Sequence, residues 1–191
     1  METDVELLSK LELASNLNLE GKHAQAAAMF AELVALGSSY AAVQLGYMHQ
    51  IGQAMEIDKL KAEELFKLSK VRGSDLGQYF LGLLYLDAER FEEAFREIRE
   101  LAELGYLPAV NRLGEMYELG IGCVVDLSYA KHYRTHAASH GHLYAMRWRA
   151  TQLIKSRRIL SILRGVVQYL KVSLTIFWFA LKRPADPRVQ A

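Results

Sequence analysis

Four glycines at nearly constant spacing constrain the fold of this chain more than any other feature. Gly37, Gly73, Gly105 and Gly141 are separated by 36, 32 and 36 residues. An alanine lies eleven residues before each glycine and a small residue lies four residues after it. The alanines are Ala26, Ala62, Ala94 and Ala130, and the small residues are Ala41, Gly77, Ala109 and Ala145. A period in this range is typical of repeat proteins, whose units stack to bury a shared core.

Each repeating unit is predicted to be a pair of helices. The first helix carries Leu-Gly at the same offset in three units, ending at Gly46, Gly82 and Gly114. Glycine within a helix costs about 1 kcal/mol relative to alanine, so its recurrence indicates a neighbouring helix packed too closely for a side chain. The second helix runs to the spaced glycine, which suits a left-handed C-cap. Asp58 and Asp126 are expected to cap the second helices. We therefore predict an all-α solenoid of helical hairpins.

Residues 109–141 resemble a Sel1-like repeat. The matching positions are Ala109, Leu113, Gly114, Tyr117, Gly120, Gly122, Asp126, Ala130, Ala137, Ala138 and Gly141. Residues 41–73 follow the same pattern with His49 and Ala54 as departures. Residues 77–105 lack four residues of the inter-helix loop and look closer to a tetratricopeptide repeat, as do residues 11–37. The resemblance covers about residues 11–150 and implies a right-handed solenoid that acts as a scaffold or adaptor.

The C-terminal part of the chain differs from the repeats in charge and hydropathy. Residues 1–146 contain 13 Lys and Arg against 21 Asp and Glu, whereas residues 147–191 contain ten against one. Residues 159–181 are almost entirely apolar, with the polar side chains of Arg164, Gln168, Lys171 and others on one narrow helical stripe. We therefore predict two parts, a repeat solenoid over residues 1–150 and a basic, apolar helix with a short tail over residues 151–191.

Three environments could accept this apolar helix. It could lie in a membrane interface, cross the bilayer, or cap the solenoid's own end, either within one chain or as part of a dimer. The stretch 165–181 is at the lower length limit for crossing, contains Lys171, and would carry Arg188 outward against the positive-inside tendency. These points favour the interface. The residues expected to contact a membrane or a partner helix are Arg157, Arg164, Lys171, Ile176, Phe177, Trp178, Phe179, Lys182 and Arg183.

Few residues suggest catalytic or metal chemistry. His132, His136 and His140 share a helical face and could hold a transition metal, but they fall on the side expected to face solvent, with no carboxylate or thiol nearby in sequence. The Gly120-Ile-Gly122 turn lacks the strand and lysine of a phosphate-binding loop. Cys123 has no histidine or second cysteine nearby in sequence to activate it. We expect no enzymatic activity, no cofactor and no bound metal.

The sequence as a whole favours a non-catalytic scaffold at the cytosolic face of an inner membrane, in a protein of bacterial style. The acidic N-terminus shows no export signal. The partners expected are proteins, with a membrane protein complex favoured, and an anionic membrane surface, rather than nucleic acid or a small-molecule substrate. The expected partner-binding groove residues, all predicted to be exposed, are Gln44, Gln78, Asn111, Arg112 and Glu115. The alternative is an accessory subunit of a membrane-embedded enzyme or export complex, with the C-terminal helix packed on partner transmembrane helices.

Overall fold

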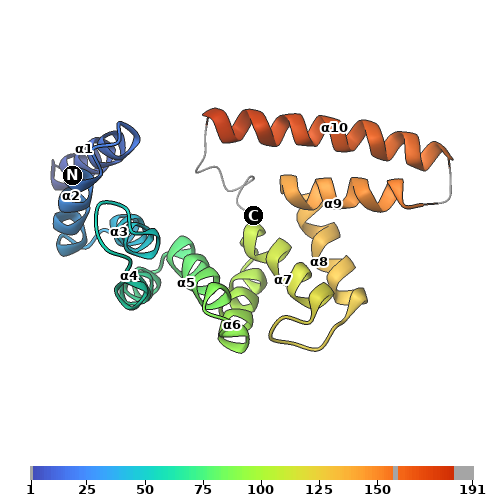
Figure 1. Cartoon of the computed structure of the whole chain (residues 1–191), viewed down its shortest axis with the longest axis horizontal. Helices are drawn as coiled ribbons and strands as arrows, with labels where there is room; N and C mark the ends of the chain where they lie inside the picture. The colour runs from blue at the N-terminus through green and yellow to red at the C-terminus, as the bar shows by residue number, and fades with distance from the viewer. Residues whose placement is uncertain (1, 157–158, 183–191) are drawn as a thin grey trace. The chain divides into compact units, whose positions relative to one another are not determined.

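The described part of the chain is entirely helical. A computed structural model describes residues 2–156 and 159–182, and within these residues it contains ten α-helices and no strand (Figure 1). The helices are α1 (Glu2–Leu19), α2 (His23–Ala35), α3 (Ser39–Ile51), α4 (Lys59–Val71), α5 (Asp75–Asp87), α6 (Phe91–Glu103), α7 (Leu107–Leu119), α8 (Leu127–Ser139), α9 (Leu143–Ile154) and α10 (Ile159–Lys182). The predicted all-α solenoid class is confirmed. The link between α5 and α6 is four residues shorter than those following α3 and α7, as the sequence predicts.

The chain forms two compact units, one ending at Glu89 and one beginning at Arg90. The first unit contains α1 to α5 and the second contains α6 to α10. Within each unit, every helix packs against the next one along the chain, so the helical hairpins stack as repeat units do.

The N-cap aspartates and the C-terminal glycines predicted from the sequence are confirmed. Asp58 accepts a hydrogen bond from the backbone N–H of Lys61, and Asp126 accepts from those of Ser128 and Tyr129. The four spaced glycines adopt the left-handed conformation just after a helix end, with φ of +96°, +78°, +85° and +91° at Gly37, Gly73, Gly105 and Gly141.

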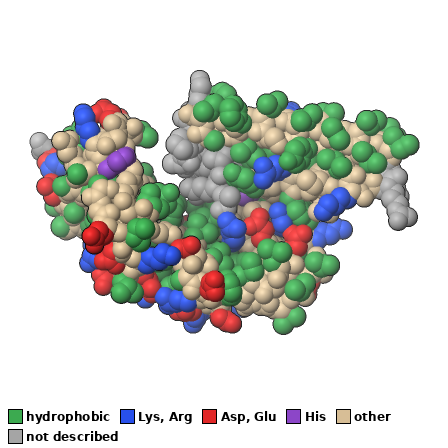
Figure 2. Space-filling view, viewed as in Figure 1, with side chains coloured by type: hydrophobic (Ala, Val, Ile, Leu, Met, Phe, Trp, Pro, Cys, Tyr) green, Lys and Arg blue, Asp and Glu red, His purple; other side chains and the backbone are tan. Residues whose placement is uncertain are grey.

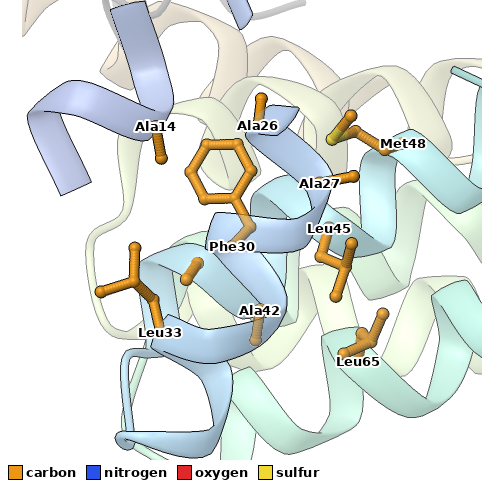
Figure 3. Packing of buried hydrophobic residues seen from close by; sticks show 10 residues of the cluster. Ala14, Ala26, Ala27, Phe30, Leu33, Ala42, Leu45, Met48 and Leu65 are labelled. Carbon is orange, nitrogen blue, oxygen red and sulfur yellow. The ribbon is translucent and has the colours of Figure 1, made fainter. Parts of the chain in front are cut away.

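Small residues allow the helices of the first unit to approach closely. Ala14, Ala26 and Ala42 are fully buried around Phe30, which fills the centre of the cluster (Figure 3). A Cβ added at Gly46 would lie 2.7 Å from the ring of Phe66. The predicted close approach at this recurrent helical glycine is therefore confirmed, and Gly114 shows the same feature, with a Cβ lying 3.1 Å from the carbonyl oxygen of Ala130.

The last two helices of the second unit pack closely against each other (Figure 1). A Cβ at Gly165 of α10 would lie 2.8 Å from the carbonyl oxygen of Ala150 and 2.9 Å from the backbone nitrogen of Ile154. Val172, two turns further on, is also buried. The expected boundary between residues 150 and 151 falls inside α9, which continues to Ile154 and carries α10 on one side.

Candidate functional site

A cluster of charged and polar side chains, here called the polar surface, lies on the second unit. It consists of Asn111, Arg112, Glu115 and Glu118 from α7, Arg134 from α8 and Trp148 from α9. Glu115 is its centre, because its carboxylate accepts from Asn111 Nδ2 at 3.1 Å and from Arg112 Nη1 at 2.8 Å.

Arg134 joins the three helices of the polar surface. Its guanidinium lies 3.4 Å from Glu115 Oε1 and 2.5 Å from Glu118 Oε2, and it stacks 4.7 Å from the centre of the Trp148 ring. The Arg134 side chain is only 12% exposed, so these ion pairs are less screened than pairs on an open surface. The arrangement fixes a pattern of charge suited to recognising a polar partner surface.

The structure corrects part of the predicted partner-binding groove. Arg112 and Glu115 are accessible, at 25% and 24% exposure, and Gln44 is half-buried. Gln78 and Asn111, however, are buried at 6% and 1%, so the expectation that they are exposed is wrong. Gln78 lies on α5 and Asn111 on α7. Neighbouring helices cover much of the surface of both helices, so that few of their side chains are exposed to solvent.

One side of α10, here called its outer face, is apolar and uncovered. Figure 2 shows hydrophobic side chains along the edge of α10 that points away from α9. The large apolar residues exposed on it are Ile159, Leu160, Leu163, Val166, Val167, Leu170, Leu174, Phe177, Trp178 and Leu181. A continuous apolar surface of this extent is typical of a membrane or protein contact.

Basic and polar residues border the outer face of α10. Arg164 and Lys171 are exposed, and neither side chain has an ion-pair partner among the residues that the structure describes. Among the other residues predicted to contact a membrane, Ile176 and Phe179 are half-buried. Arg157 and Arg183 lie outside the described residues, as does the side chain of Lys182.

A groove of about 640 Å³ runs between α9 and α10 beside this basic border. Its apolar lining comes from Leu143, Met146, Leu163, Val167 and Val172. Its polar lining comes from Arg164, Gln168, Lys171 and Thr175. The basic stripe could be predicted from the sequence, but the groove could not, because it forms between two helices that pack closely at Gly165.

A family model for the Sel1 repeat matches residues 39–70 and 107–142. The chain carries Sel1 repeats. The first corresponds to α3 and α4, and the second to α7, α8 and the short link that ends just before α9. Sel1 repeats generally act as protein-interaction scaffolds, and the polar surface is built mainly on the second of these Sel1 repeats.

Two solved bacterial structures share the fold of this chain. A Sel1 repeat protein from Oxalobacter formigenes aligns with a TM-score of 0.73 at 17% identity, over 96% of this chain and 84% of that one. The protective antigen c5321 of uropathogenic Escherichia coli, which displays an SLR fold, aligns with a TM-score of 0.54 at 17% identity, over 99% of this chain and 52% of its own. No curated protein matches the sequence significantly.

His132, His136 and His140 are exposed along α8 and at its C-cap, as the sequence predicts. The rings of His136 and His140 are 4.3 Å apart between centroids. Desolvation lowers the pKa of His136, and its neighbours His140 and His132 lower it further. No group of three or more His, Cys, Asp or Glu side chains in the described ranges is arranged to hold a metal ion.

The loop of the second Sel1 repeat is structural. Gly120 and Gly122 adopt left-handed conformations, with φ of +71° and +67°, as the hairpin loop requires. Burial raises the pKa of the Cys123 thiol, whose sulfur donates a weak hydrogen bond to the carbonyl of Met116. A thiol held protonated in this way is a poor nucleophile.

Proposed function

We propose that this protein is a non-catalytic scaffold that binds a protein partner through its Sel1 repeats while α10 holds it at the cytosolic face of a bacterial inner membrane. The outer face of α10 carries the proposal. Ten large apolar side chains on it are exposed, and Arg164 and Lys171 border it without acidic partners in the described chain. An apolar face with a basic edge suits an interface, where the apolar side chains enter the acyl region and the cations meet lipid phosphates.

The packing of α10 favours a helix that lies in the interface over one that crosses the bilayer. The stretch from Ile159 to Leu181 is long and apolar enough to cross by composition. Crossing would, however, either break the contact at Gly165 or draw Arg147 and Arg149 of α9 into the hydrocarbon. Either change is costly, because charged residues in the bilayer centre are strongly disfavoured. Lying in the interface preserves the contact with α9.

Membrane attachment is tested by charging the outer face. The triple variant Leu163→Glu, Leu170→Glu and Leu174→Glu should fold, since these side chains are 59%, 56% and 69% exposed. Burying one leucine contributes about 1.5–3 kcal/mol, so the variant should bind vesicles at least about a hundredfold more weakly. The measurement is flotation with vesicles of equal parts phosphatidylglycerol and phosphatidylcholine.

The matched control for flotation places three glutamates at exposed leucines elsewhere in the second unit: Leu104, Leu119 and Leu127. The control variant should float like the unmodified chain. Equal flotation of the two triple variants would show that α10 is not the attachment site. If the unmodified chain fails to float and instead copurifies with an integral membrane protein, α10 packs on a partner's helices and the accessory-subunit alternative gains support.

Partner binding is tested at the polar surface. A photo-crosslinking residue at position 112, where Arg112 is part-exposed beside Glu115, should form one discrete protein adduct in cells. The same residue at position 96, an exposed arginine of α6, serves as the control and should give no such adduct. Equal adducts at both positions would indicate nonspecific collision and would contradict partner binding at this surface.

A further inference from the structure

The groove between α9 and α10 has a polar edge and an apolar wall that run in parallel. Arg164, Gln168 and Lys171 occur at i, i+4 and i+7 on α10, so they succeed one another on one side of the helix. Leu143, Met146 and Val172 form the apolar wall. At about 640 Å³ the groove lies within the usual range of roughly 300–1,000 Å³ for small-molecule sites.

The chemistry of this lining selects an amphiphile with an anionic head. Arg164 and Lys171 have no acidic partner among the described residues, so their positive charge is available to a ligand. Their Cα atoms are about 10 Å apart along the helix axis, a distance that two long side chains can close around one phosphate. The Gln168 amide can donate to the same phosphate. The apolar wall suits a hydrocarbon chain.

The groove is continuous with the outer face of α10. Leu163 and Val167 belong to both, being 59% and 67% exposed while also lining the groove. A molecule whose chain lies among the apolar residues of the outer face can therefore place its head at the basic edge. This continuity favours a ligand drawn from the bilayer over one drawn from solution.

We propose that the α9–α10 groove binds a single anionic phospholipid, with its phosphate between Arg164 and Lys171 and one acyl chain against Leu143, Met146 and Val172. This inference rests on the proposed membrane attachment and adds a specific lipid class to it. The outer face attaches the helix to any bilayer, and the groove selects the lipid headgroup.

Lipid selection is tested by native mass spectrometry of the full chain. The protein is released from detergent micelles that contain equal amounts of phosphatidylglycerol and phosphatidylcholine. We expect one phosphatidylglycerol molecule to remain bound, with at least a tenfold preference over phosphatidylcholine. The double variant Arg164→Gln and Lys171→Gln should lose this preference. The matched double variant Lys131→Gln and Lys155→Gln, which removes two exposed charges outside the groove, should keep it.

A second variant separates groove binding from surface charge. Met146→Trp places a larger side chain in the groove and leaves Arg164 and Lys171 in place. It should lower phosphatidylglycerol retention at least tenfold while the variant still floats with anionic vesicles. Retention equal to that of the unmodified chain would overturn the inference, because the lipid would then be held by charge alone.

Flotation of the same proteins distinguishes the two proposals. If the unmodified chain floats but retains the two lipids equally, the lipid site is wrong and membrane attachment stands. If it retains phosphatidylglycerol in micelles but does not float, the proposed attachment is wrong and the groove still binds the lipid. Retention by the Arg164→Gln and Lys171→Gln variant at the unmodified level also overturns the lipid site.

Discussion

Replacing Gly122 by alanine should lower the free energy of unfolding by about 3 kcal/mol. Gly122 has a φ of +67°, which costs an L-residue roughly 1–2 kcal/mol. A Cβ at this position would also overlap the backbone carbonyl of Phe91 at the start of α6. Backbone cannot rotate away as a side chain can, so the loop must shift, and overpacking of this kind costs about 1–3 kcal/mol.

The measurement for Gly122 is urea unfolding followed by far-ultraviolet circular dichroism, with Gly105→Ala as the control. Gly105 has a comparable φ of +85°, but an added Cβ there would meet nothing within 4 Å. The control should therefore lose only about 1 kcal/mol, from backbone conformation alone. If the two variants lose equal stability, the close approach of the loop to Phe91 contributes nothing.

Replacing Arg134 by alanine should destabilise the second unit by about 2 kcal/mol. The substitution removes contacts to Glu115 and Glu118 and the stacking on Trp148. Breaking a buried ion pair from one side costs about 3–5 kcal/mol, but Glu115 and Glu118 remain 24% and 35% exposed, and solvent screening reduces the cost. The measurement is again urea unfolding. The substitution should lower the urea concentration at the midpoint without changing the dependence of the free energy of unfolding on urea concentration.

The comparison variant for Arg134 is Arg112→Ala. Arg112 is 25% exposed, and among the residues that the structure describes its ion-pair partner is Glu115, at 2.8 Å. Its removal should cost about 0.5–1 kcal/mol, as for a partly screened pair. An equal or larger loss at Arg112 would show that the polar surface is not organised around Arg134.

The repeat architecture could be predicted because its signals are local. A glycine at a left-handed helix end, an aspartate one position before a helix, and a small residue at a helix crossing each act through a few neighbouring atoms. Gly141, Asp126 and Gly46 therefore have the conformations and contacts that their sequence positions indicate. The histidines on α8 likewise follow helical periodicity and are exposed as predicted.

The features that the sequence did not reveal depend on which helix covers which. Asparagine is usually found on the surface, yet Asn111 is buried because helices on both sides of α7 enclose it. Arg134 is unremarkable within α8 and becomes important only because Glu115 and Trp148 come from two other helices. For α10, Gly165 was the available signal. A glycine in an apolar helix indicates close packing, but its partner on α9 cannot be identified without coordinates.

The close packing of α10 against α9 at Gly165 would also fix how the repeats of the second unit are oriented relative to a membrane that α10 binds. A domain joined to its membrane anchor by a flexible linker rotates freely. A partner bound to such a domain therefore samples many distances and orientations relative to the membrane surface. In this protein α10, the proposed membrane anchor, packs closely against the backbone of α9, which also carries Trp148 of the polar surface. A protein held on that surface would therefore meet the membrane plane in one restricted pose. This restricted orientation raises the effective concentration of the partner near membrane targets that it can reach in that orientation, and lowers it near other targets.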